Sequence, residues 1–235
     1  MLQGKTILVV VPARGGSKGI KLKNIYPLNG KPLLVYTGEV VQQLDYVDRA
    51  VVSTDHEDIA NVARACGLAA PFYRPESLSG DQIGDWDVLH HALHAMEAQD
   101  GRNYDIVVML QPTSPLRQPQ HVTKTVTTLI EGEYDAVWTV SPTDSKAHPL
   151  KQFVVNDQCL EYYDPAGAQI IARQQLTPVY HRNGVAYAIR RACLLDKKSI
   201  KGDRTGAVII DEPLANIDTE VDILFAEFLL SRRRT

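Results

Sequence analysis

Apolar residues recur with two different periods along the chain, and their alternation predicts an α/β fold. Short runs rich in β-branched residues at 7–11, 49–54 and 105–110 are typical of buried strands. Between the first two runs, apolar residues three and four apart predict a helix whose first turn holds Pro32, and a second helix follows over 59–66. Strand, helix, strand, helix is the order of a doubly wound, mostly parallel sheet, so we expect a Rossmann-like fold.

The same patterns predict the remaining elements. They are a short strand at 71–75, helices near 86–96 and 122–130, strands at 135–140, 185–189 and 207–210, and a C-terminal helix over 221–229. The strand at 185–189 alternates as if one of its faces were buried. The C-terminal helix is amphipathic, and its predicted apolar face is formed by Val221, Leu224, Phe225, Phe228 and Leu229.

One segment, from Pro142 to about Pro178, shows neither period. A break of this size inside a compact domain suggests a functional insert. We therefore expect one domain over 1–235 that contains a small insert at 142–178. The apolar residues Tyr162, Tyr163, Ile170 and Ile171 suggest that this insert needs a partner surface, and hence a homodimer.

The first strand leads into a loop that combines three glycines with four cations, Arg14, Lys18, Lys21 and Lys23. Open α/β sheets bind ligands at the carboxyl ends of their strands. Glycines let backbone N–H groups approach a ligand closely, and the cations favour an anion, so the expected ligand is a polyphosphate. The loop matches neither the Walker A pattern nor G-x-G-x-x-G, and an ordinary solvated turn is the alternative.

Composition narrows the class of protein. The 235 residues include 25 Lys and Arg against 28 Asp and Glu, a net charge of −3 that argues against non-specific nucleic-acid binding. The three cysteines form no C-x-x-C pair, and no 18-residue apolar span or signal peptide is apparent, so we expect a cytoplasmic protein without a membrane segment. His90 and His94 are one helical turn apart, but the glutamate of H-E-x-x-H is missing, which favours histidines that face solvent or pack.

Four ordered motifs carry a family resemblance. They are Ala13–Gly19 with Lys23–Asn24, Gln111–Arg117, Arg173–Gln175 with Arg182–Gly184, and Ile217–Glu220. Together the motifs resemble those of the CMP-sialic acid synthetases. The resemblance implies a nucleotidyltransferase fold of the glycosyltransferase A-like type and a homodimer. It also implies a reaction in which CTP and an acidic nine-carbon sugar give a CMP-sugar and pyrophosphate, with Mg²⁺ or Mn²⁺ as cofactor.

The resemblance also implies roles for individual residues. It places CTP against Ala13, Arg14, Gly15, Ser17, Lys23, Asn24, Arg74, Ser79 and Asp81, and the sugar against Gln111, Lys151, Arg173 and Gln175. Arg14 and Lys23 are the candidates for stabilising the triphosphate, and Asp218 is the candidate metal ligand. Asn216 stands where the family usually has aspartate, which puts a second charged ligand in doubt.

Several alternatives remain open at this point. Asp218 or Thr219 would also serve as the N-cap of the last helix, and Arg74 and Lys151 could be ordinary surface cations. The rival reactions are activation of an octulosonate, whose enzymes have a different opening loop, and loss of catalysis in a nucleotide-binding regulator. The sequence indicates neither a general base nor which nonulosonic acid is used.

Overall fold

The computed structural model describes residues 1–233 and divides into two compact units. The first unit consists of Met1–Thr139, Asn183–Val208 and the chain from Glu212 onward, and the second of Val140–Arg182 and Ile209–Asp211. Among the described helices, none is both long and apolar enough to cross a membrane.

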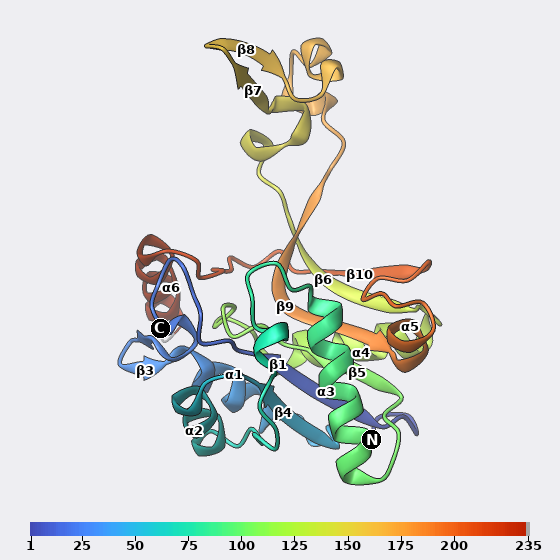
Figure 1. The fold of residues 1–235 in the computed structure, drawn as a ribbon. Helices are drawn as coiled ribbons and strands as arrows, with labels where there is room; N and C mark the ends of the chain where they lie inside the picture. Colours follow the sequence, from blue (N-terminus) through green and yellow to red (C-terminus); the bar gives the residue numbers. More distant parts are fainter. Residues whose placement is uncertain (234–235) are drawn as a thin grey trace. The chain divides into compact units, whose positions relative to one another are not determined.

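A six-stranded sheet with the order β10-β6-β9-β5-β1-β4 is the centre of the fold (Figure 1). Strands β1 (Ile7–Pro12), β4 (Arg49–Ser53) and β5 (Ile106–Met109) are parallel, with Val9 opposite Ala50 on one side and Val108 on the other. Strand β9 (Tyr180–Arg190) runs antiparallel to β5. The outer strands on that side are β6 (Ala136–Pro142) and β10 (Thr205–Ile209).

Both faces of β1 are covered, because all five residues from Ile7 to Val11 are fully buried although successive side chains point to opposite faces. On one face, Leu8 and Val10 pack in a cluster with α3 (Asp85–Asp100) and α5 (Arg191–Leu195). Figure 1 shows α3 lying across the strands. Helices α1 (Leu33–Val41), α2 (Glu57–Ala65) and α4 (Pro119–Glu131) contribute further buried apolar residues.

A smaller apolar cluster connects the Gly-rich loop to the C-terminal part of the chain. Ile20 of the loop packs there with Ile217 and with Ile223 of α6 (Glu220–Arg232). The cluster also includes Leu28 of the short hairpin formed by β2 (Pro27–Leu28) and β3 (Lys31–Pro32). This packing brings residues 13–24 and 216–218 to the same place.

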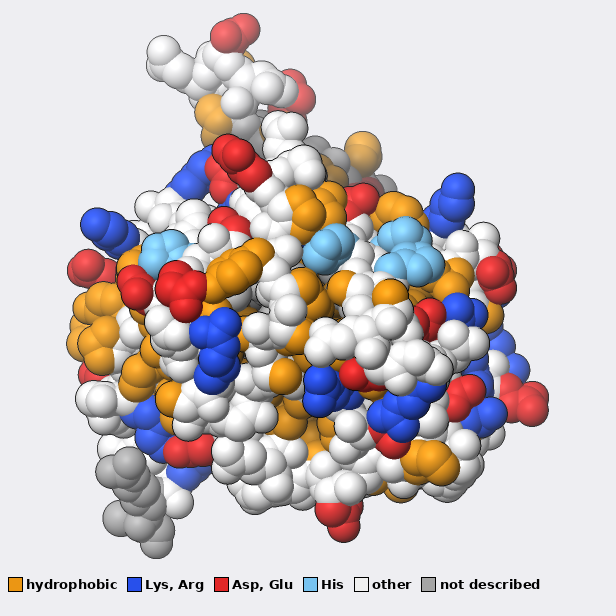
Figure 2. Space-filling view, turned by 60° about the horizontal axis from the view of Figure 1, so that its bottom comes forward, with side chains coloured by type: hydrophobic (Ala, Val, Ile, Leu, Met, Phe, Trp, Pro, Cys, Tyr) orange, Lys and Arg blue, Asp and Glu red, His pale blue; other side chains and the backbone are white. Residues whose placement is uncertain are grey.

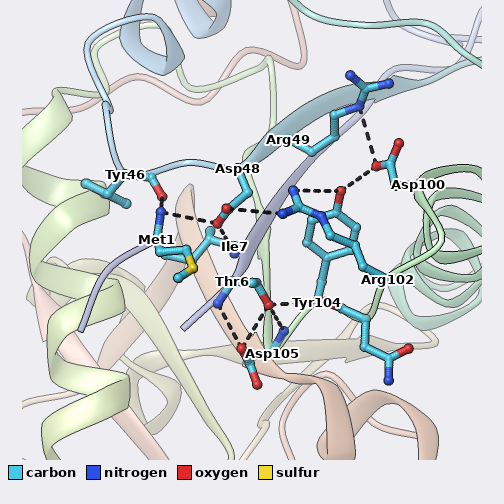
Figure 3. A network of polar contacts seen from close by, with 11 residues as sticks. Met1, Thr6, Ile7, Tyr46, Asp48, Arg49, Asp100, Arg102, Tyr104 and Asp105 are labelled. Carbon is cyan, nitrogen blue, oxygen red and sulfur yellow. Dashed lines mark hydrogen bonds and ion pairs between the residues drawn. The ribbon is translucent and has the colours of Figure 1, made fainter. Parts of the chain in front are cut away.

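Carboxylates fix the amino ends of the parallel strands (Figure 3). Asp48 directly precedes β4, and its Oδ2 accepts a hydrogen bond of 2.8 Å from the backbone N–H of Ile7. Asp105 directly precedes β5, and its Oδ2 accepts bonds of 2.8 Å from both the backbone N–H and the hydroxyl of Thr6. Each carboxylate thus ties its own strand to the start of β1.

The second unit contains a small antiparallel hairpin and several single-turn 3₁₀ helices. The hairpin pairs β7 (Phe153–Asn156) with β8 (Cys159–Tyr162), and the helical turns are Ser145–Ala147, Pro149–Lys151, Pro165–Gln169 and Arg173–Gln175. The unit includes the segment 142–178 that lacked a regular period. Its short elements explain why neither the helical nor the strand period could be read there.

Three expectations about elements were wrong. Residues 71–75 form no strand, since Pro71 and Pro75 lack the N–H groups that a ladder needs and only Ala69 bridges Val51. The 185–189 part of β9 is buried on both faces, since every residue from Val185 to Ile189 is at most 1% exposed, and Tyr187 and Ile189 pack in the cluster with α3 and α5 on one of them.

The third error concerns α6, whose predicted apolar face is largely exposed. Val221 is 72% exposed, Leu224 67%, Phe225 47% and Phe228 52%. The helix instead buries Ile223 and Ala226 in the cluster with Ile20. A run of residues that is apolar on more than one side does not indicate which side faces the core.

Candidate active site

A cavity of about 520 Å³ lies at the carboxyl ends of the parallel strands, within the first unit. Its lining comes from the Gly-rich loop, the segment 74–88, the turn after β5 and the segment before α6 (Pro12, Arg14, Ser17, Lys18, Gly19, Lys23, Asn24, Arg74, Leu78, Gly80, Asp81, Ile83, Asp85, Val88, Gln111, Pro112, Thr113, Asn216 and Asp218). The volume is sufficient for a small-molecule ligand.

Backbone and amide contacts hold the Gly-rich loop in place. The N–H of Ala13 donates to the carbonyl of Ser53 at 2.9 Å, and the N–H of Gly15 donates to Asp55 Oδ1 at 2.8 Å. Asn24 is buried, and its side-chain amide donates to the carbonyl of Arg14 at 2.9 Å. These contacts orient the loop before any ligand arrives.

Gly19 shows why the loop needs glycine. A Cβ atom at this position would lie 2.5 Å from the carbonyl oxygen of Asp218, which is closer than real Cβ contacts allow. The absence of a side chain lets the loop and the segment before α6 touch. Lys23 then reaches Asp218, with 2.7 Å between Nζ and Oδ1.

Three cations of the cavity, Arg14, Lys18 and Lys23, are paired with carboxylates. Arg14 contacts Asp81 at 2.7 Å and Lys18 contacts the same carboxylate at 2.6 Å, so that Lys18 and then Arg14 hold the pKa of Asp81 below its usual range. The carboxylates are more exposed than the principal cations. The side chains of Asp81 and Asp218 are 41% and 69% exposed, against 31% for Arg14 and 16% for Lys23. Such pairs are weak, so a triphosphate can replace the carboxylates.

Arg74 is a buried part of the cavity wall and no ordinary surface cation. It is only 5% exposed, and its Nε donates to the hydroxyl of Ser53 at 3.1 Å. Burial lowers the pKa of Arg74 to about 10, which leaves it charged at neutral pH. A guanidinium fixed in this way can present its remaining donors in one direction.

A second buried arginine shapes the turn after β5. The Nη1 atom of Arg117 donates to the hydroxyl of Thr37 at 2.8 Å. Its Nη2 atom donates to two backbone carbonyls, that of Gly184 at 3.0 Å and that of Gln111 at 2.5 Å. Burial lowers its pKa to about 9. Arg117 therefore supports the turn from behind, while Gln111 lines the cavity itself.

Gly184 touches that turn as well. It has φ = +72°, and a Cβ there would come within 2.6 Å of both Gln111 Oε1 and Ser114 Oγ. The arginine and the glycine together define where the Gln111 side chain can lie.

Sequence reasoning missed the apolar side of the cavity. Leu78, Ile83 and Val88 line it, together with the carboxylate of Asp85 at the first position of α3. The available signal was position, since these residues lie close in sequence to Ser79 and Asp81, which the family resemblance places against CTP. Helix periodicity predicted a helix near 86–96 but did not indicate that Val88 faces the cavity.

The structure brings together most of the residues predicted to bind CTP. Ala13 is fully buried, and Ser79 borders a smaller groove beside Arg14 and Lys18 and accepts from Arg14 at 3.4 Å through its carbonyl. Gly15 contributes the backbone contact to Asp55 described above. Lys151, Arg173 and Gln175 belong to the second unit, where Gln175 Oε1 accepts from the backbone N–H groups of residues 171 and 172 at 2.8 Å.

The candidate metal ligands border the cavity. Thr219 caps α6, with its hydroxyl accepting from Asp222 N–H at 3.4 Å, so the Asp218 side chain is left for Lys23 and the cavity. Asn216 lines the same wall. One carboxylate and one amide oxygen beside the cations of the cavity fit a Mg²⁺ ion that takes its other ligands from a triphosphate and water. Within residues 1–233, no three His, Cys, Asp or Glu side chains form a metal-binding group of their own.

Charge on the surface is mixed rather than one-sided. Figure 2 shows Lys and Arg side chains interspersed with Asp and Glu across the face that it presents. This agrees with the net charge of −3.

Comparison with known proteins identifies the family. The model of the cytidylyltransferase family matches residues 8–227. The chain belongs to the cytidylyltransferase family. It is accordingly a nucleotidyltransferase, and the resemblance found in the motifs is confirmed at this level.

Two relatives and one solved structure are similar to this cytidylyltransferase over nearly its whole length. It is 30% identical to the pseudaminic acid cytidylyltransferase of Campylobacter jejuni (94% of this chain, 95% of the relative). It is also 30% identical to the CMP-N,N'-diacetyllegionaminic acid synthase of Legionella pneumophila (95% and 96%). The fold is similar to the structure of CMP:2-keto-3-deoxy-manno-octonic acid synthetase complexed with CTP, with a TM-score of 0.71 and 20% sequence identity. The match covers 97% of this chain and 99% of that chain, and it confirms the α/β fold.

Proposed function

We propose that this cytidylyltransferase transfers CMP from CTP to an acidic nonulosonic sugar and releases pyrophosphate. The observation that carries the proposal is the cavity in which Arg14, Lys18 and Lys23 converge at the carboxyl ends of β1 and β5. The substrate class is supported by the relatives from Campylobacter and Legionella, whose names specify nine-carbon sugar acids. CTP occurs in the cytoplasm, so the proposal includes a cytoplasmic location.

The residues perform the reaction mainly by positioning and by stabilising charge. The anomeric hydroxyl of the sugar attacks the α-phosphorus of CTP, the bond between that phosphorus and the oxygen bridging to the β-phosphate breaks, pyrophosphate leaves, and the hydroxyl proton passes to water. Arg14 and Lys23 exchange Asp81 and Asp218 for phosphate oxygens and stabilise the negative charge that develops on the leaving pyrophosphate. Arg74, fixed by Ser53, directs its guanidinium toward the nucleotide, and the apolar side chains of Leu78, Ile83 and Val88 provide a surface for the base.

Asp218 and Asn216 are the residues that would hold Mg²⁺ or Mn²⁺. When bound, the ion neutralises part of the triphosphate charge and favours in-line geometry. Because only one of the two residues is charged, CTP must supply a large share of the ligands, and full activity should need a high magnesium concentration. Gln111 is the proposed contact to the sugar on the opposite side of the reacting phosphorus. Lys151, Arg173 and Gln175 are proposed to bind the sugar and its carboxylate.

The metal proposal has its own test, Asn216→Asp. A second carboxylate within about 4 Å of the ion should lower the magnesium concentration for half-maximal rate at least about tenfold, measured at saturating CTP. The KM for the sugar should change little. An unchanged magnesium titration in the folded variant would show that Asn216 does not touch the metal, and Asn216→Ala serves as the uncharged control.

We further propose a homodimer in which the second unit contributes to the interface. Val155, Leu160 and Tyr163 of that unit are 67%, 64% and 68% exposed, and Ile171 is 93% exposed, although apolar surface of this kind is normally covered. Light scattering of the full chain should report twice the monomer mass, and a double substitution Leu160→Glu and Ile171→Glu should reduce it. A monomer at assay concentration would contradict this part of the proposal.

Pyrophosphate release tests the function directly. The enzyme should turn over with CTP and at least one of N-acetylneuraminate, legionaminate and pseudaminate, while ATP and GTP support little turnover. A rate seen only with an octulosonate would favour the rival sugar. If no sugar acid supported pyrophosphate release although calorimetry detected CTP binding, the result would favour a regulator that has lost catalysis.

A further inference from the structure

A second feature of α3 lies outside the nucleotide cavity. His90 and His94 are one turn apart on this helix, and their Nε2 atoms lie 3.1 Å from each other. The two rings are in edge contact, with centroids 4.4 Å apart and an angle of 71° between their planes. Neither histidine lines the nucleotide cavity.

This separation matches that of two nitrogen ligands on one metal ion. With Zn–N bonds of 2.0–2.1 Å, two nitrogens at angles between 90° and the tetrahedral value lie about 2.9–3.4 Å apart. Trp86 packs on the His90 ring with centroids 4.9 Å apart, so one of the two rings is already oriented. Both rings border an open cavity of about 630 Å³ together with Asp87 and His91, which leaves room for water ligands.

We propose that His90 and His94 form a two-histidine chelate for a nitrogen-preferring divalent ion, Zn²⁺, Ni²⁺ or Cu²⁺. Each neutral imidazole would offer its Nε2 lone pair to the ion. The histidine that now donates from Nε2 moves its proton to Nδ1 by exchange with water, so both imidazoles stay neutral and the ion takes the place of the hydrogen between the two nitrogens. Water completes the coordination, in keeping with the finding that residues 1–233 contain no three-ligand group. Imidazole ligands distinguish this site from the Mg²⁺ site beside Asp218, because magnesium prefers oxygen.

Calorimetric titration of Zn²⁺ into the full chain without a histidine tag, in excess Mg²⁺, tests the site. We expect one Zn²⁺ site per chain. His94→Ala and His90→Gln should each lower the affinity for Zn²⁺ about a hundredfold, because the second ligand of a chelate binds at high effective concentration. His94 is exposed, so its substitution should leave the fold intact, and circular dichroism checks this.

A register control keeps the number of histidines constant. His94→Ala combined with Ala98→His places the pair two turns apart, about 12 Å along the axis, where one ion cannot bridge them. This variant should bind Zn²⁺ as weakly as His94→Ala alone. With Cu²⁺ as probe, electron paramagnetic resonance of the wild type should show coupling to two imidazole nitrogens. Equal affinity in the wild type and the register control, or in the wild type and His94→Ala, would overturn the proposal.

Discussion

The two ends of the parallel strands both carry charged side chains, but they use them differently. At the amino ends, the carboxylates of Asp48 and Asp105 accept hydrogen bonds from backbone N–H groups of β1 or the residue before it. At the carboxyl ends, the side chains of Arg14 and Lys23 form ion pairs with Asp81 and Asp218, whose carboxylates are more exposed than the two cations. Arg14 also donates a long hydrogen bond of 3.4 Å to a backbone carbonyl, that of Ser79. A backbone donor cannot leave its place without unfolding, whereas an exposed carboxylate can rotate away. The amino ends therefore stabilise the sheet and the carboxyl ends remain available to a ligand.

The largest effect should come from the carboxyl ends. Arg14→Ala and Lys23→Ala should each lower kcat about a hundredfold or more, because each cation stabilises charge on the leaving pyrophosphate. The melting temperature should hardly change, since neither side chain belongs to the core. Steady-state pyrophosphate release and thermal unfolding measure the two quantities. Lys21→Ala is the matched control, a cation on the same loop that is exposed and does not line the cavity.

The amino ends should show the opposite behaviour. Asp48→Ala leaves the N–H of the fully buried Ile7 without its acceptor and should lower the free energy of unfolding by about 1–3 kcal/mol, measured by urea titration. The kcat at saturating substrates should be retained at temperatures where the variant is folded. Asp48→Asn keeps an acceptor oxygen, so its free energy of unfolding should fall much less than that of Asp48→Ala. If Asp48→Ala reduced kcat without reducing stability, the contrast between the two ends would be wrong.

Asp81→Asn sharpens the comparison at the carboxyl ends. If Asp81 occupies the place of phosphate, removing its charge should lower the KM for CTP about two- to fivefold, the range expected from an exposed ion pair. The role that the family resemblance implies for Asp81, a direct contact to bound CTP, predicts a higher KM instead. Initial rates over a range of CTP concentrations at low ionic strength decide between them, with Glu76→Gln as a nearby carboxylate control.

The smallest effect concerns acid. Burial raises the pKa of Asp105, but the hydrogen bonds from Thr6 outweigh it and hold that pKa below its ordinary value of about 4. The contribution of this carboxylate to stability is therefore complete above pH 4 and is lost as the pH falls through the lowered pKa. Because Asp105 is exposed, we expect Asp105→Asn to lower the free energy of unfolding by no more than about 0.5 kcal/mol at pH 7. The difference in the free energy of unfolding between the variant and the wild type, measured by urea titration at several pH values, should disappear below pH 4. A difference that grew in acid would contradict this assignment.

Local patterns predicted most of the fold and the position of the site. The buried runs became β1, β4 and β5, and the Gly-rich loop does lie at the carboxyl end of β1. Prediction failed where the outcome depends on distant contacts. Which side of α6 is buried depends on Ile20 and Leu28, almost two hundred residues earlier, and no helical period contains that information.

The site was predictable in the same uneven way. Arg14, Lys18 and Lys23 could be named as cations at the carboxyl end of β1, because they follow a buried strand in a glycine-rich loop, and they do line the cavity. That they bind phosphate stays a prediction. The pairing of Arg14 with Asp81 depends on how the 79–84 loop returns to the sheet, and the support of Gln111 by Arg117 depends on burial. Of the histidines on α3, the spacing of His90 and His94 was visible in the sequence, but the approach of their Nε2 atoms depends on rotamers.

The contact between Lys23 and Asp218 joins residues separated by 195 positions. During synthesis on a ribosome, the first βαβ units can emerge and pair long before the segment that carries Asn216 and Asp218 exists. One wall of the cavity is then missing, and Gly19 has no carbonyl to pack against. Interrupted chains would contain the central strands of the sheet without a complete nucleotide site. The cavity is therefore closed on the side of Asn216 and Asp218 only after nearly the whole chain has been made.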